Sequence, residues 1–138
     1  MITRFRAWNK ATKEMYGADE IIAINFEEKE ICVQTIYFEQ GLPDSRDLDY
    51  YDFDDIVLMQ STGMRDKNDR EIFEGDILDY RGRKALVRWH GSYASFIYRF
   101  VDELQNRNTE WKPLYLAYMK CEIIGNIYEN QELLEDKE

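Results

Sequence analysis

Residues 57–80 constrain the fold more than any other part of the chain, because they contain two apolar alternations separated by a turn signal. The segment reads VLMQSTGMRDKNDREIFEGDILDY. An alternating segment that contains Leu58 and Gln60 leads into Ser-Thr-Gly at 61–63. Residues 66–69 then form a polar turn, and residues 72–77 begin a new strand. This order predicts a β-hairpin that enters a small barrel. Gly75 lies at a strand bend where a Cβ would be crowded, so we predict either a positive φ or a close backbone approach there.

Short segments rich in β-branched and aromatic residues recur along the rest of the chain, separated by turn residues. They predict strands at residues 5–7, 21–26, 31–38, 56–60, 71–80, 84–90, 96–101, 115–118 and 121–128, and a brief helix at 132–135 capped by Asn130. We therefore expect a mainly β, antiparallel fold: an SH3-like small barrel with an N-terminal β-hairpin region and a short C-terminal helix.

The 138 residues are enough for one domain with its own core. We expect an N-terminal hairpin region at about 1–43, an acidic loop at about 44–55, a barrel at about 56–128 and a C-terminal tail at 129–138. The alternation of Phe96, Tyr98 and Phe100 places them on one core face. Trp89 is in phase with Ala85 and Val87, which predicts a place in the barrel core.

Three blocks of the sequence resemble those of one known family. They are RFRAW at 4–8 followed by Lys10, Lys13, Met15 and Tyr16; the TG, DKN, EI and EGDI order within 57–80; and IIGNIYEN at 123–130 followed by Leu133 and Leu134. In this order and over the whole chain, the blocks resemble the YopX family. Asp69 replaces a common glycine and Gln131 a frequent proline, but Asn68 and Asp69 both tolerate left-handed backbone. The resemblance implies an accessory protein of phages or prophages of Gram-positive bacteria and implies no particular reaction.

The charge of the chain is high and unevenly distributed. Net charge is −10, yet residues 44–55 hold six aspartates and one arginine, whereas residues 81–101 hold five basic residues and no acid. Such a molecule can attract a basic partner at one place and a polyanion at another. Cys32 and Cys121 lie in apolar segments without a metal-ligand spacing, which predicts reduced core cysteines. No segment approaches the ~18 apolar residues of a membrane span, so we expect a cytoplasmic protein of the bacterial host with no membrane partner.

The acidic loop is the candidate protein-docking site. Its aspartates do not follow the alternate-position pattern of a calcium loop, and a central glycine and a terminal glutamate are missing, so no metal is predicted. Aromatic side chains seldom accumulate in a loop that only needs to be solvated. The candidate docking residues are Asp49, Tyr50, Tyr51, Asp52, Phe53 and Asp54. Burial of the three rings by the barrel itself, as an ordinary flap, is the alternative.

The basic aromatic stretch at 81–101 is the candidate nucleic-acid contact. Stacking aromatics and phosphate-binding arginines could act together on a small barrel. The candidate contacts are Arg81, Arg83, Lys84 and Arg88. In the alternative interpretation the aromatics form the core and the charges pair with the acidic loop.

Catalytic patterns are weak throughout the sequence. His90 is the single histidine, the serines lie in no nucleophile elbow, and the scattered glycines form no phosphate-binding loop. We therefore expect no enzyme, no catalytic residues and no cofactor. The expected function is a non-catalytic protein-binding or regulatory module whose partner is a host or phage protein or a second copy of the chain. A nucleic-acid-binding barrel is the alternative.

Overall fold

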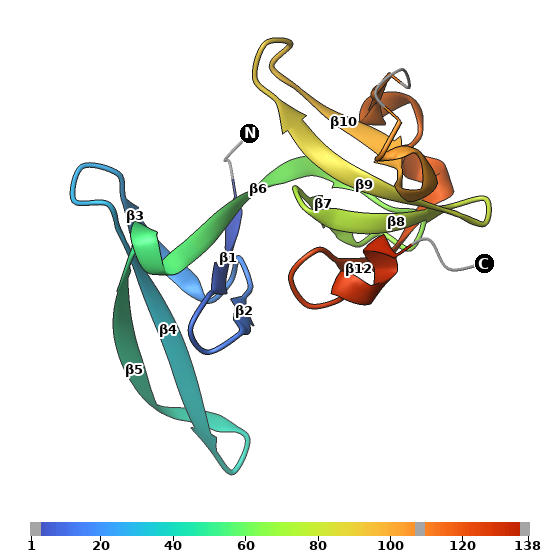
Figure 1. Ribbon diagram of the computed structural model, residues 1–138. Helices are drawn as coiled ribbons and strands as arrows, with labels where there is room; N and C mark the ends of the chain where they lie inside the picture. Colours follow the sequence, from blue (N-terminus) through green and yellow to red (C-terminus); the bar gives the residue numbers. More distant parts are fainter. Residues whose placement is uncertain (1–3, 107–109, 136–138) are drawn as a thin grey trace. The chain divides into compact units, whose positions relative to one another are not determined.

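The computed structural model describes residues 4–106 and 110–135 and confirms a mainly β, antiparallel fold (Figure 1). Within the described residues, helix is limited to short 3-10 turns. The chain divides into two compact units, residues 2–59 and residues 60–138. Strand β6 (Ile56–Arg65) begins in the first unit and ends in the second.

The N-terminal unit contains a short hairpin and a three-stranded sheet whose last two strands form a long β-ribbon. Strands β1 (Phe5–Asn9) and β2 (Glu14–Tyr16) pair antiparallel, and β6 pairs with β1. Strands β3 (Ile21–Asn25), β4 (Glu30–Glu39) and β5 (Leu42–Asp52) form a separate sheet in the order β3-β4-β5, followed by a 3-10 turn, η1 (Phe53–Asp55). The buried core of this unit consists of Ala7, Tyr16, Ile31, Val33 and Ile56.

The prediction of an irregular acidic loop at 44–55 was wrong, because residues 42–52 form strand β5. Its register with β4 runs from Glu30 opposite Asp52 to Glu39 opposite Leu42, with one irregularity after Tyr37. A tight turn at Gln40 and Gly41, both at positive φ, connects the two strands. Aspartate is depleted in strands in general, but β5 is an edge strand with charges in solvent, which discourages pairing with other chains.

The C-terminal unit is a curled, half-barrel sheet (Figure 1). The strands of this sheet are β8 (Asp76–Tyr80), β9 (Arg83–His90), β10 (Ser95–Phe100), β11 (Lys112–Pro113) and β12 (Cys121–Asn126), in the order β11-β10-β9-β8-β12. Strand β7 (Glu71–Phe73) pairs with β6 instead. The 3-10 turns of this unit are η2 (Val101–Glu103), η3 (Leu114–Leu116), η4 (Tyr118–Lys120) and η5 (Gln131–Leu134).

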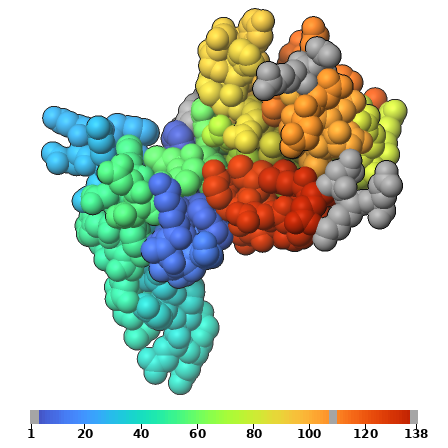
Figure 2. Space-filling model, in the orientation of Figure 1, coloured from blue at the N-terminus to red at the C-terminus, as the bar shows by residue number. Residues whose placement is uncertain are grey.

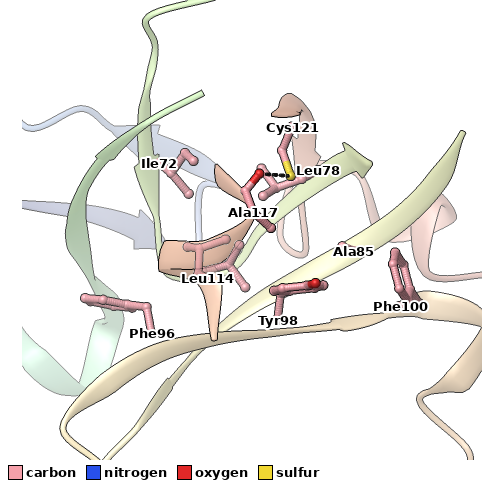
Figure 3. Packing of buried hydrophobic residues seen from close by; sticks show 10 residues of the cluster. Ile72, Leu78, Ala85, Phe96, Tyr98, Phe100, Leu114, Ala117 and Cys121 are labelled. Atoms are coloured by element: carbon pink, nitrogen blue, oxygen red, sulfur yellow. Dashed lines mark hydrogen bonds between the residues drawn. The ribbon is translucent and has the colours of Figure 1, made fainter. Parts of the chain in front are cut away.

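The core of this unit lies inside the curl of the sheet (Figure 3). Phe96, Tyr98 and Phe100 are all buried, as predicted from their alternation. The fully buried Leu114 and Cys121 pack in the same cluster, and the Cys121 thiol donates a hydrogen bond to the Ala117 carbonyl at 3.3 Å. Both cysteines are buried and unpaired, which confirms the prediction of free core cysteines.

Two predicted elements near the C-terminus differ in the structure. Residues 115–118 lie in 3-10 turns rather than in a strand, since β11 ends at Pro113. The predicted helix at 132–135 is the single 3-10 turn η5. The Asn130 side chain makes no cap; its Oδ1 instead accepts a hydrogen bond from the Asn126 N–H at 3.1 Å. The last three residues of the predicted tail, 136–138, lie outside the described part of the chain.

One backbone prediction is confirmed and one burial prediction was wrong. Gly75 has φ 87°, as predicted, and Asp69, at φ 64°, adopts the left-handed backbone that aspartate tolerates. Trp89, however, is 39% exposed. The reason is the width of the sheet, because β8 pairs with β9 only from Arg83 to Leu86, and Trp89 lies beyond that overlap on the β9–β10 hairpin. Its phase with Ala85 and Val87 is correct, but the pairing of β8 with β9 ends three residues before Trp89.

Candidate protein-docking site

The β4–β5 ribbon extends well past β3. Strand β3 pairs with β4 only between Glu30 and Val33, whereas β4 and β5 remain paired as far as Glu39 and Leu42. We call residues 34–48, beyond the overlap with β3, the arm; it is the narrow projecting hairpin of Figure 1 and the teal lobe of Figure 2. A two-stranded ribbon of this kind buries little of its own side-chain surface.

The two faces of the ribbon differ in chemistry. Side chains opposite one another across an antiparallel pair share a face, and the faces alternate along each strand. One face carries Gln34 with Leu48, Ile36 with Arg46, and Phe38 with Pro43, and continues toward the base of the sheet through Tyr50. We call it the apolar face. The other, acidic face carries Thr35 with Asp47 and Tyr37 with Ser45, and continues through Asp49.

Side-chain hydrogen bonds confirm this division. The Tyr37 hydroxyl donates to Asp47 Oδ2 at 3.0 Å on the acidic face, and this bond raises the pKa of Tyr37 above its ordinary value. On the apolar face Arg46 Nη1 donates to Gln34 Oε1 at 2.9 Å. The large apolar side chains of that face are exposed: Phe38 by 64%, Tyr50 by 61%, Ile36 by 44% and Leu48 by 38%.

A shallow groove lies on the arm. Its volume is about 220 Å³, and its lining residues are Gln34, Ile36, Pro43, Asp44, Ser45 and Arg46. Asp44 lies at the irregularity of the register, between Ser45 opposite Tyr37 and Pro43 opposite Phe38. The irregularity thus places Asp44 in the lining of a groove that also contains Ile36 and Pro43.

The structure separates the three aromatic residues predicted for docking. Tyr50 is exposed, whereas Tyr51 stacks on Tyr16 with ring centroids 5.4 Å apart, and Phe53 packs edge-to-face on Phe26 at 5.8 Å. Hydrogen bonding to Tyr16, together with burial, raises the pKa of Tyr51 to about 12. Tyr51 and Phe53 both pack against the N-terminal core. The predicted aspartates Asp49, Asp52 and Asp54 are exposed.

Sequence reasoning missed the exposed apolar residues of the arm. Ile36, Phe38 and Leu48 have the same even-numbered phase as Tyr50, which was the available signal. It became readable only with the β4–β5 register and the end of β3, because alternation assigns side chains to a common face without showing which face remains exposed.

The basic candidates lie at different places in the C-terminal unit. Arg83 forms ion pairs with Asp102 at 2.7 Å and Glu103 at 3.2 Å, and the hydrogen bond to Asp102 raises its pKa further. Lys84 Nζ donates to the Glu135 carbonyl at 3.0 Å. The alternative interpretation, in which these charges pair with the acidic loop, is therefore wrong for Arg83. Arg81 and Arg88 are exposed.

Residues 4–106 and 110–135 contain neither a cluster of metal ligands nor a membrane-spanning helix. No group of three or more His, Cys, Asp or Glu side chains in that part of the chain is arranged to hold a metal ion. None of its helices combines the length and apolar character that a membrane crossing requires.

Comparison with known proteins decides the family. The family model described as YopX protein matches residues 4–135. The chain belongs to the YopX family. A search of curated proteins finds no match. Among solved structures, this YopX-family protein is similar to the crystal structure of protein EF1440 from Enterococcus faecalis, with 27% identity, a TM-score of 0.60, and coverage of 98% of this chain and 99% of the other. The likeness thus extends over both units of the chain.

Proposed function

We propose that this YopX-family protein is a non-catalytic protein-binding module, encoded by a phage or prophage and acting in the bacterial cytoplasm on a host or phage protein. The observation that carries the proposal is the exposed apolar face of the arm. Antiparallel sheets normally place their polar side chains on the face turned to solvent. Here the arm presents Ile36, Phe38 and Leu48 to solvent on one face, while its other face combines Asp47 and Glu39 with the exposed Tyr37 and Leu42.

The energetics favour a partner for this face. Burying a large apolar side chain contributes roughly 1.5 to 3 kcal/mol, and contiguous exposed apolar side chains usually mark an interaction site. Four such side chains on one face, Ile36 and Phe38 along β4 and Leu48 and Tyr50 along β5, form an apolar row that offers a partner several anchors. An interface with a few large anchors derives most of its affinity from them.

The test is affinity purification from the bacterial host with two matched variants. Phe38→Ser with Leu48→Ser removes two anchors from the apolar face, and Thr35→Ala with Tyr37→Ser alters the opposite face of the same arm. We expect one dominant co-purifying protein with the wild type and the acidic-face variant, and its loss with the apolar-face variant. Equal recovery with all three proteins would exclude the arm as the binding site.

Nucleic-acid binding by an SH3-like C-terminal barrel is the second candidate, and one observation favours it. Arg88, Trp89 and the 76% exposed Tyr93 lie on the β9–β10 hairpin, where a base could stack beside a phosphate-binding arginine. Against it, Arg83 and Lys84 are already engaged with partners in their own unit. A gel shift with single- and double-stranded DNA and RNA, repeated at higher salt and with Arg88→Ala, tests this function.

A further inference from the structure

We propose that the apolar face of the arm binds a lysine- and arginine-rich amphipathic segment of another protein. This inference rests on the proposed protein-binding function and specifies the chemistry of the partner. Three observations carry it: the exposed apolar row, the charge of the ribbon around it, and the composition of the groove.

The apolar row requires an apolar stripe on the partner. Phe38 and Ile36 follow one another along one strand, and Leu48 and Tyr50 along the other, all on one face. A partner that covers them must present apolar side chains along a comparable line. An amphipathic helix does so with residues spaced three and four apart.

The charge of the ribbon requires that the rest of the partner be basic. Residues 30–52 contain six carboxylates and one arginine and no lysine, a local charge of −5. Of the carboxylates of edge strand β5, Asp44 lines the groove, whereas Asp47 and Asp49 lie on the opposite face of the same ribbon and act through the field of the ribbon as a whole. Such a surface accelerates encounter with a cationic segment and repels an anionic one.

The groove shows how one basic side chain would bind. A lysine or arginine has an apolar stem and a charged end, and both find a complement in the lining. The stem packs against Ile36 and Pro43, and the cation faces the Asp44 carboxylate. Arg46, the basic residue of the lining, is held by its hydrogen bond to Gln34.

The same charges disfavour a second copy of the chain as the occupant. Two apolar faces placed together would bring two ribbons of charge −5 into contact, each part of a chain of net charge −10. Pairing along the β5 edge is opposed in the same way, because charged side chains on an edge strand discourage strand addition.

The experiment uses the full-length protein and three fluorescent synthetic helical peptides. The first carries leucine on one face and lysine on the other, the second replaces lysine by glutamate, and the third keeps the lysines and replaces leucine by glutamine. Binding is followed by fluorescence anisotropy at physiological salt. We expect the leucine–lysine peptide to bind at least about tenfold more tightly than either of the others, because only it satisfies both requirements.

Variants then assign the binding to the apolar face. Ile36→Ser with Phe38→Ser is expected to weaken the leucine–lysine peptide by about tenfold or more, and Asp44→Asn by a smaller factor, whereas Thr35→Ser with Tyr37→Ser on the acidic face leaves affinity within about twofold. All these side chains are on the arm, outside the N-terminal core, and unchanged thermal unfolding would verify that each variant folds.

Several outcomes would overturn the inference. These are equal binding of the leucine–lysine and lysine–glutamine peptides, tighter binding of the leucine–glutamate peptide, equal affinity of the two double variants, or a concentration-dependent dimer that Phe38→Ser dissolves. If the host partner still depends on Phe38 in affinity purification, protein binding by the arm stands and only the basic character of the partner is wrong. If that dependence is also absent, the proposed function fails.

Discussion

At the scale of single residues, neighbouring positions on one strand have opposite roles. Tyr50 is exposed on the ribbon, whereas Tyr51 stacks on Tyr16 and packs against the N-terminal core. We expect Tyr51→Ser to lower the free energy of unfolding by about 2 to 3 kcal/mol and Tyr50→Ser to change it by about 0.5 kcal/mol or less. Urea denaturation of the full chain measures both. Comparable losses from the two changes would contradict the assignment of the two faces.

Gly125 is a glycine for which the structure leaves no space for a side chain. A Cβ there would lie 2.5 Å from Asn130 Oδ1 and 2.8 Å from Leu133 Cδ1, so alanine must displace these two side chains, and with Asn130 Oδ1 its hydrogen bond from the Asn126 N–H. We expect Gly125→Ala to destabilise the protein by about 2 kcal/mol. Gly91→Ala is the matched control, because the nearest atom to its Cβ, Trp89 Nε1, is 4.0 Å away. Equal melting temperatures for the two variants would refute the crowding at Gly125.

At the scale of elements, one carboxylate organises the turn between β6 and β7. Buried Asp66 accepts N–H hydrogen bonds from Asn68 at 3.0 Å, and from Arg70 and Ile123 at 2.9 Å each. Burial alone would raise the pKa of this carboxyl, but these donors and the Arg70 guanidinium outweigh it and lower the pKa below its usual value. The turn of the hairpin and strand β12 are thereby fastened to the same side chain.

The lowered pKa makes the contribution of Asp66 to stability dependent on pH. Since the folded-state pKa is below the unfolded value of about 3.9, the stabilisation is complete well above pH 4 and is lost as pH falls through the folded-state pKa. Asp66→Asn is expected to lower the free energy of unfolding by about 2 to 3 kcal/mol at pH 7 and by less at pH 3. Denaturation at the two pH values measures this difference. A loss that stays constant with pH would show that the charge is not involved.

At the scale of the whole molecule, β6 is a single strand that takes part in both units, pairing with β1 in one and with β7 in the other. A unit of 2–59 with a small core would gain little stability by itself. We therefore predict one cooperative unfolding transition, as expected for a single domain. Trp8 reports on the first unit, and Trp89 and Trp111 report on the second, so tryptophan-to-phenylalanine variants can follow each unit separately. Two separate urea midpoints would contradict the prediction.

Much of this protein could be predicted from local sequence patterns. The strands around residues 5–9, 21–25, 30–39, 56–65 and 71–100, the positive φ of Gly75, and the core face of β10 follow from alternation and turn chemistry, which act over a few residues. Family membership follows from the same local blocks, and the family model confirms it.

The candidate site needed the tertiary structure, for a physical reason. Alternation shows that Leu48 and Tyr50 share one face and Asp49 and Tyr51 the other, but a strand has no intrinsic inside. Which face is buried depends on the register with β4 and on how far β3 and β8 extend beside their neighbours. The register sets Tyr51 opposite Ile31 and against the core, the short pairing of β8 with β9 leaves Trp89 beyond it, and the short β3 leaves Ile36, Phe38 and Leu48 exposed on the arm. Local sequence therefore determined the strands, and contacts between segments distant in the chain determined which side chains remain available for binding.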